Sequence, residues 1–207
     1  MEQPQPAPHF YSVEEYFELE EQSETRHEYY RGEVFAMAGG TANHNELVLN
    51  LVMLLRAGAQ PQGCRVFAES VQLVVSQGLY YTYPDVMVTC HPDDIAAERQ
   101  MHHPLLLAEV LSPSTAERDR IWKMLRYQRL NSLRHYLLIS QEYQAVEWYQ
   151  RASSNALWTH RVLIHDEFLE LPELALRIRV GDIYGALKIQ LSTTDKPVSG
   201  EMFKEKE

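Results

Sequence analysis

The chain of 207 residues lacks any long apolar run. No stretch of roughly 18 consecutive apolar residues, which is about the length that crosses a bilayer as a helix, occurs in the sequence. The amino terminus also lacks the basic segment followed by an apolar one that marks a signal peptide. We therefore expect neither a membrane span nor a secretory leader, and we expect the protein to be cytoplasmic.

Cysteine is scarce, since Cys64 and Cys90 are the two cysteines of the chain. They do not form a Cys-x-x-Cys pair, and two cysteines are too few for a disulfide framework. In a reducing compartment we expect both to be buried, reduced side chains that behave as small apolar groups. The same count disfavours a structural zinc site.

Basic residues are outnumbered, with 19 Lys and Arg against 29 Asp and Glu and a net charge of −10. This balance argues against tight non-specific binding to nucleic acid, which depends on neutralising phosphates. Six cations nevertheless gather in one short stretch with Asp119 as its one acid: Arg118, Arg120, Lys123, Arg126, Arg129 and Arg134. The stretch is either a solvated helix face or a phosphate-binding surface, for which Arg118, Arg120 and Arg126 are our candidates.

The segment 105–112 is apolar on both alternating faces except at Glu109. A continuous apolar run of this length is typical of a strand that is covered on both faces. A carboxylate buried there without a partner would lose several kcal/mol of solvation. Glu109 therefore needs an arginine, a proton or a metal ion as its partner.

Two neighbouring segments favour the metal. Asp85 follows Pro84 near the start of a second predicted strand, and a helix that carries Lys123 follows the break at 112–115. Two carboxylates can hold a hard divalent cation, the cation lowers the pKa of bound water toward about 7, and an ammonium group stabilises charge that develops on phosphorus. This pattern indicates phosphodiester hydrolysis.

These residues resemble the Uma-type restriction endonucleases within the PD-(D/E)XK nuclease superfamily. The resemblance runs from about Tyr11 to Leu187 and rests on segments 28–33, 37–45, 83–86 and 109–112, and on Asp119 with Lys123. It implies that Asp85 and Glu109 bind the metal and that Lys123 is the catalytic lysine. The lysine has moved to the helix, because an apolar Leu111 occupies the strand position that is usual for it.

The chain differs from the family pattern at a few positions. Ser70 and Gln72 stand where an Asp and an Arg are common, Ile121 stands where a Gly is common, and Ser140 stands where an Asp usually closes the next strand. These differences bear on activity and leave the expected fold unchanged.

The periodicity predicts one α/β domain over 11–192 with a mixed β-sheet flanked by helices, and polar tails at 1–10 and 193–207, and the resemblance implies that this sheet is restriction-endonuclease-like. A capping box at Ser12 begins the first helix, and a hairpin turns at Arg31 and Gly32. Helices are expected at 13–21, 43–56 and 116–130, and strands at 27–38 (the hairpin), 65–75, 81–89, 105–112, 135–139, 145–150, 157–164 and 174–180. The strand–helix–strand unit across 105–139 predicts parallel pairing.

Three further features leave alternatives open. Glu33 lies beside the hairpin turn, where it is either solvated or directed at the site. His44 begins a helix, where histidine is more often a cap or surface residue than a ligand, and only the resemblance makes it a supporting candidate. His91, His102 and His103 share one connection, but they lack the helical spacing of zinc proteases, so we expect a solvated loop.

The predicted function is that of a metal-dependent endonuclease acting on nucleic acid, most simply DNA. Oxygen ligands from Asp85, Glu109 and the Val110 carbonyl favour Mg²⁺ or Mn²⁺, and cutting both strands favours a homodimer. Two alternatives fit the same residues. One is a catalytically idle nuclease-fold module that binds nucleic acid or protein, and the other is a metal-dependent hydrolase of small phosphoesters.

Overall fold

The computed structural model of the protein describes residues 9–37 and 39–192. The predicted polar tails, 1–10 and 193–207, lie outside the described residues apart from positions 9 and 10. The helices are α1 Val13–Gln22, α2 Ala42–Ala59, α3 Pro92–Ala96, α4 Met124–Tyr127 and α5 Val180–Tyr184, with 3₁₀ turns at Gln60–Gln62 and Pro172–Leu174. In the part of the chain that is described, no helix is long and apolar enough to cross a membrane.

The larger of the sheets is mixed and has the order β11-β10-β9-β8-β6-β3, with β14 beside β10. Its strands are β3 Arg65–Ala68, β6 Val86–Thr89, β8 Pro104–Val110, β9 His135–Ile139, β10 Tyr143–Gln150, β11 Thr159–Ile164 and β14 Gln190–Leu191. β8 and β9 pair in parallel, as predicted, and β6 pairs antiparallel to β8. The carboxyl end of β8 therefore lies beside the amino end of β6.

A second sheet has the order β2-β1-β5-β4-β7, and β12 and β13 form a separate pair. The strands are β1 His27–Tyr30, β2 Glu33–Ala36, β4 Gln72–Ser76, β5 Tyr80–Thr82, β7 Gln100–Met101, β12 Phe168–Leu171 and β13 Leu176–Arg179. The predicted strand at 174–180 is thus β13, paired with β12 and not with the outer strands of the large sheet.

Two predicted strands were each too long. The segment 65–75 divides into β3 and β4, which belong to different sheets, because Glu69 between them adopts a left-handed backbone conformation with φ +52°. The segment 81–89 divides into β5 and β6 around Pro84, which has no N–H to donate to a ladder. Asp85 therefore lies in the bend immediately before β6.

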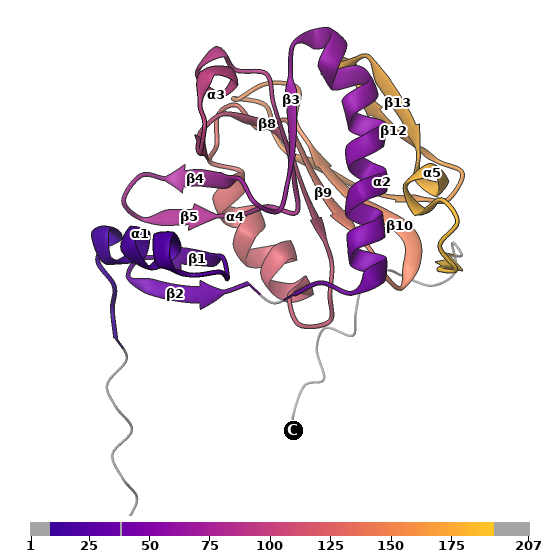
Figure 1. Ribbon diagram of the computed structural model, residues 1–207. Coiled ribbons are helices and arrows are strands. Elements are labelled where there is room, and N and C mark those ends of the chain that lie inside the picture. Colours follow the sequence, from indigo (N-terminus) through magenta and orange to yellow (C-terminus); the bar gives the residue numbers. More distant parts are fainter. Residues whose placement is uncertain (1–8, 38, 193–207) are drawn as a thin grey trace, which may run out of the picture.

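The elements are arranged in layers (Figure 1). Separate apolar cores lie between these layers. α2 covers one face of the large sheet with a buried stripe made of Leu47, Leu51 and Leu55. The helix that ends in α4 packs between the other face and the small sheet, where Tyr127 and Tyr80 stack in the second core. Tyr16 of α1 packs on the opposite face of the small sheet against Tyr81.

The helix after β8 is not a regular α-helix. Residues Arg118–Lys123 form a π-helical turn that continues directly into α4. A π turn bonds i to i+5 and so inserts an extra residue into the helix, a feature that is frequent at functional sites. Within this turn Asp119 and Lys123 are buried while Ile121 is exposed.

The expectation of two reduced cysteines was wrong, because Cys64 and Cys90 form a disulfide. Their flanking residues Arg65 and Thr89 are a cross-strand pair of β3 and β6, so the two cysteines extend the same antiparallel register by one step. The sequence places the two cysteines 26 positions apart, and only the pairing of β3 with β6 brings them together.

We expect this disulfide to stabilise the oxidised protein. Closing a loop of this length stabilises the protein by about 3.5 kcal/mol by chain entropy, so a reducing agent should lower the melting temperature by several degrees. Thermal unfolding with and without dithiothreitol measures the difference, and Cys90→Ser should melt at one temperature under both conditions. Two alkylatable thiols in the native, air-oxidised protein would contradict the pairing.

Candidate active site

A hollow of about 410 Å³ opens where the two sheets, the π turn and the start of α2 meet. Its charged lining consists of Glu28, His44, Asp85, Glu109, Arg118, Asp119 and Lys123. Because Val86 pairs with Ala108, Asp85 before β6 and Glu109 on β8 are neighbours across the antiparallel register. The three residues predicted as catalytic, Asp85, Glu109 and Lys123, thus line one hollow.

Asp85 is held by the backbone of the neighbouring strand. Its Oδ2 accepts a hydrogen bond of 2.6 Å from the Val110 N–H, and its Oδ1 lies 3.5 Å from His44 Nε2. The structure therefore gives Val110 a positioning contact to Asp85 through its N–H. A ligand role for the Val110 carbonyl stays a prediction.

Glu109 has a cation and a phenol as partners, and no arginine contacts it among the described residues. Lys123 Nζ lies 2.9 Å from its Oε1, and the Tyr127 hydroxyl donates to the same oxygen at 3.0 Å. Burial raises the pKa of Glu109 well above its usual value, and the nearby Asp85 and Asp119 carboxylates raise it further against the opposing effect of Lys123. Burial is therefore the main reason that the pKa of this carboxyl group is raised, and a cation beside it would oppose that effect.

Lys123 lies among carboxylates from three elements. Its Nζ is 2.9 Å from Glu109, 3.1 Å from Asp119 and 3.4 Å from Glu28. Burial alone would lower the pKa of Lys123, but Glu109 and Glu28 outweigh it and raise the pKa well above its usual value. The π turn carries Asp119 and Lys123 into the same hollow, and the ammonium group stays charged there.

Glu28 of β1 is a site residue that sequence reasoning missed. It is buried, accepts a 2.6 Å hydrogen bond from the Thr82 hydroxyl and pairs with Arg118 as well as Lys123. Burial would raise the pKa of Glu28, yet Lys123 and Arg118 lower it overall. The segment 28–33 belonged to the recognised pattern, but its alternation alone could not tell which of its two glutamates faces the site.

Glu33 lies elsewhere. It is exposed at the hairpin turn, opposite Tyr30 in the β1–β2 register, and lines an adjoining hollow with Phe35 and Trp122. Of the two alternatives left open for Glu33, the structure shows the solvated one. A supporting role for Glu33 stays a prediction.

His44 is both a helix-start residue and a neighbour of Asp85. Its N–H donates to the Thr41 hydroxyl that caps α2, while its ring reaches Asp85 and lies 3.3 Å from Glu69 Oε1. The hydrogen bond with Asp85 raises the pKa of His44, against the effect of burial. His44, Glu69 and Asp85 offer ligand atoms that all lie within 4.8 Å of one another.

This chemistry fits a divalent cation. Four carboxylates of the hollow, those of Glu28, Asp85, Glu109 and Asp119, face only two permanent cations, Lys123 and Arg118. Oxygen-rich, negatively charged sites suit Mg²⁺ or Mn²⁺. Glu69 was missed as a neighbour of this site because its left-handed backbone conformation, which directs it there, has no sequence signature in a non-glycine residue.

The three arginines predicted to bind nucleic acid are each engaged within the protein. Arg118 pairs with Glu28, Arg120 pairs with Glu147 at 2.7 Å, and the Arg126 guanidinium lies 3.6 Å from the centre of a Trp122 ring. These three cations of the basic stretch are therefore neither fully solvated nor without partners in the protein. Its role toward nucleic acid stays a prediction.

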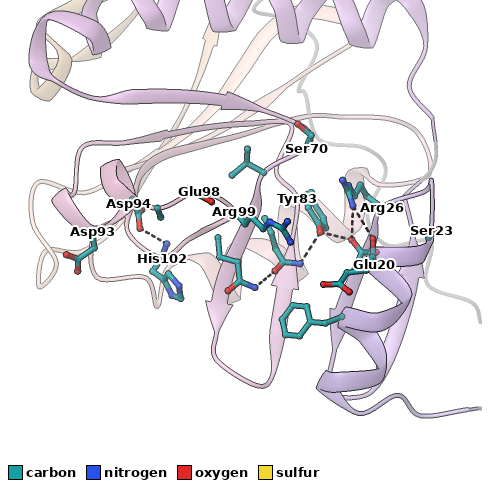
Figure 2. Close-up of a pocket in the computed structure, with 16 residues that line it drawn as sticks. Glu20, Ser23, Arg26, Ser70, Tyr83, Asp93, Asp94, Glu98, Arg99 and His102 are labelled. Atoms are coloured by element: carbon teal, nitrogen blue, oxygen red, sulfur yellow. Dashed lines mark hydrogen bonds and ion pairs between the residues drawn. The ribbon is translucent and has the colours of Figure 1, made fainter.

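A larger hollow of about 980 Å³ is lined by residues of α1, of the segment that leads into β4, and of α3 and its connection to β7 (Figure 2). Its polar wall is already bonded, since Tyr83 donates to Glu20 at 2.6 Å and Gln72 donates to Tyr83 at 3.0 Å. Tyr83 lines both hollows. Size favours this second hollow, but the buried carboxylates around a lysine make the smaller one the candidate for catalysis.

The positions that differ from the family pattern have local roles. Gln72 bonds two buried tyrosines, Tyr16 and Tyr83, and thereby closes the wall of the larger hollow. The Ser140 hydroxyl accepts from the N–H groups of Glu142 and Tyr143 and shapes the β9–β10 turn. Neither position contributes to the carboxylate cluster.

Comparison with known proteins places the fold and the family. Residues 13–181 match the Uma2 family, described as "Putative restriction endonuclease". A crystal structure described as "a putative nuclease belonging to DUF820", from Anabaena variabilis ATCC 29413, superposes with a TM-score of 0.68 at 20% identity over 84% of this chain and 97% of that one. This superposition confirms the predicted nuclease-like mixed α/β fold.

Two relatives from Synechocystis sp. (strain ATCC 27184 / PCC 6803 / Kazusa) are similar in sequence. "Uncharacterized protein slr1290" is 32% identical over 85% of this chain and 92% of its own length. "Uncharacterized protein sll1609" is 37% identical over 66% of this chain and 78% of its own length. With the family match extending from α1 into α5, the chain belongs to the Uma2 family of restriction-endonuclease-like proteins.

Proposed function

We propose that the protein is a metal-dependent endonuclease that hydrolyses phosphodiester bonds in DNA, with residues 11–192 acting as one domain. The observation that carries the proposal is the meeting of Asp85 and Glu109 with Lys123 in one hollow. The description of the family as restriction endonucleases supports a nuclease. The nuclease title of the Anabaena structure agrees with it.

In this proposal Asp85 and Glu109 hold Mg²⁺ or Mn²⁺, with His44 and Glu69 as additional groups beside Asp85. When bound, the cation supplies Lewis acidity and a more acidic water. The Val110 N–H fixes the Asp85 carboxylate, and the Tyr127 hydroxyl fixes that of Glu109. Lys123 stabilises negative charge developing on the attacked phosphate, since its ammonium group stays protonated.

Glu28 and Asp119 position Lys123 in this scheme, and Arg118 ties Glu28 to the π turn. The net charge of −10 disfavours long-range attraction of DNA. Substrate binding therefore depends on the bound cation and on the local cations of the helix. A homodimer would supply a second site for the second strand of a duplex.

A second candidate is a catalytically idle module that keeps the nuclease fold and binds nucleic acid or protein. The internal engagement of Arg118, Arg120 and Arg126 favours the protein-binding form of this candidate, because cations already bonded within the protein gain less from phosphates. The two candidates differ in one measurable property, which is metal-dependent cleavage.

Glu109→Gln and Asp85→Asn should each reduce nicking of supercoiled plasmid in Mg²⁺ or Mn²⁺ by at least about 100-fold. A metal ion contributes several kcal/mol to the transition state, and each 1.4 kcal/mol or so is tenfold in rate. Glu98→Gln, an exposed carboxylate on the larger hollow, is the matched control and should cleave like the parent. Parent protein that never nicks DNA with either metal would favour the idle module.

Lys123→Ala should abolish cleavage and leave DNA affinity nearly unchanged, because an interaction made mainly in the transition state lowers kcat more than binding. Arg129→Ala removes an exposed cation from the same basic stretch, and it should weaken binding slightly and reduce the salt slope by about one unit. Single-turnover rates and salt titrations measure both effects.

Because a buried carboxylate left without its cation can cost about 3–5 kcal/mol, thermal unfolding must first establish that Lys123→Ala folds. Lys123→Arg keeps the positive charge beside the buried carboxylates, so it serves as a second variant if Lys123→Ala does not fold. If the alanine variants at positions 123 and 129 both cleave like the parent and change the salt slope equally, Lys123 takes no part in the chemical step.

Glu28→Gln should slow single-turnover cleavage by about tenfold or more, because glutamine keeps one acceptor oxygen but removes the negative charge that Lys123 and Arg118 pair with, and a hydrogen bond to a charged partner contributes about 1.5–3 kcal/mol. Glu33→Gln, five positions along the same hairpin and exposed, should cleave at the parental rate. A slow Glu33→Gln variant together with a Glu28→Gln variant that cleaves at the parental rate would show that Glu33, and not Glu28, acts in the site.

A further inference from the structure

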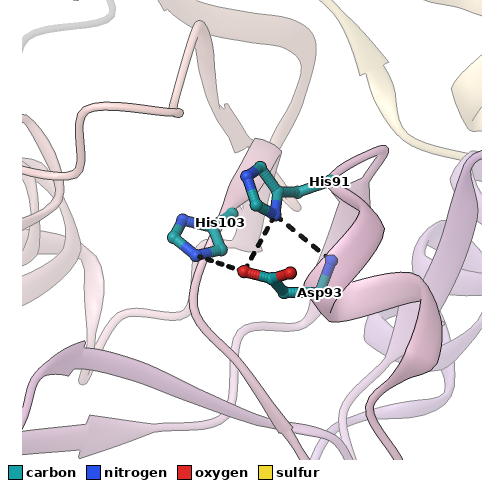
Figure 3. Close-up of side chains that lie close together, drawn as sticks. All are labelled: His91, Asp93 and His103. Carbon is teal, nitrogen blue, oxygen red and sulfur yellow. Dashed lines mark hydrogen bonds and ion pairs between the residues drawn. The ribbon is translucent and has the colours of Figure 1, made fainter.

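A second group of possible metal ligands lies far along the large sheet from the candidate active site. His91 follows β6, Asp93 lies in the first turn of α3, and His103 precedes β8 (Figure 3). Asp85 precedes β6 and His91 follows it, so the two groups lie at opposite ends of the same strand. Nothing in the proposed nuclease chemistry uses these three residues.

The three side chains converge on one point. Asp93 Oδ2 lies 3.7 Å from His91 Nδ1 and 3.9 Å from His103 Nε2, and the two imidazole rings are 4.0 Å apart between centroids. Ligand atoms around a tetrahedral ion with bonds of about 2.1 Å are about 3.4 Å apart. The two separations from Asp93 therefore need to close by only about 0.3 to 0.5 Å, and all three ligand atoms lie within 4.8 Å of one another.

The backbone that carries these ligands is fixed by a buried neighbour. Asp94 is 1% exposed, and its carboxylate accepts from the N–H groups of His102 and His103 at 2.9 and 2.8 Å. Asp94 thereby ties the His103 segment to α3, whose first turn carries Asp93. On the other side, the disulfide of Cys90 anchors the residue before His91. The three ligands are thus close together before any ion binds, and an ion on His91 Nδ1 would replace the 3.3 Å hydrogen bond that this nitrogen accepts from the Asp93 N–H.

The choice of ion follows from the donor atoms. Two imidazole nitrogens and one carboxylate oxygen suit zinc and its first-row neighbours, whereas Mg²⁺ and Ca²⁺ prefer oxygen alone. Without an ion, two adjacent imidazoles gain little from each other. We propose that His91, Asp93 and His103 bind one divalent transition-metal ion of the zinc class, separate from the cation of the nuclease site.

An ion at this position would join α3 to the connection between β7 and β8. Asp93 and His102 also line the larger hollow, so the ion would lie at the rim of that hollow. All three ligands retain exposed surface, which leaves room for water at the remaining coordination positions. The site therefore combines a fixed backbone with open access from solvent.

The test uses untagged, metal-free protein and Zn²⁺ in calorimetry, with Co²⁺ as the spectroscopic probe. His91→Ala and His103→Ala should each weaken binding at this site by at least about tenfold, in line with the effect of losing partners in metal sites. They should also remove the Zn²⁺-induced rise in melting temperature. His102→Ala is the matched control, because His102 is next to His103 in sequence but lines the larger hollow (Figure 2). This variant should bind Zn²⁺ like the parent.

The Asp85→Asn variant separates this site from the nuclease site, because it should keep the Zn²⁺ site that His103→Ala loses. His91 is exposed and His103 is half-buried, and His91→Ala also removes the side chain that caps α3, so thermal unfolding without metal checks that each variant folds. Equal Zn²⁺ affinity in parent and His103→Ala, or an equal loss in His102→Ala, would overturn the proposal whether or not the protein cleaves DNA.

Discussion

The arrangement of the candidate site depends on one buried ammonium group surrounded by acids. Lys123 Nζ lies within 3.4 Å of carboxylates from β1, β8 and its own π turn. Each of those carboxylates would be costly to bury alone, and Lys123 alone would lose its charge through burial. Together they form a charged cluster with a surplus of negative charge. In the proposed function, that surplus is what attracts the divalent cation.

The sequence predicted the strong patterns and missed what depends on backbone direction. The apolar run around Glu109, the capping box at Ser12 and the parallel return into β9 are found as expected, because periodicity and cap chemistry are local. The divisions of the strands at Glu69 and Pro84 depend on how two sheets are packed. The local propensity of residues for strand or loop does not show where a chain leaves one sheet and enters another.

The same limit applies to the site residues. Asp85, Glu109 and Lys123 could be singled out because each interrupts an apolar or structural pattern near the others in sequence. Glu28 could not, because its partners Thr82 and Arg118 are distant in the chain and meet it only through the β1–β5 pairing and the π turn. For the same reason the pairing of Cys64 with Cys90 was not predictable from spacing.

The helix that carries Lys123 has a consequence for how the site is assembled. Asp85 and Glu109 belong to the large sheet, whereas Glu28 belongs to the small sheet, and the π turn lies between them with Trp122 against Tyr30 and Tyr80. The carboxylates beside the large sheet, the carboxylate of Glu28 and the ammonium group of Lys123 therefore meet only while the two sheets and the helix between them remain docked. Aromatic packing between the layers thus sets whether the charges are in place.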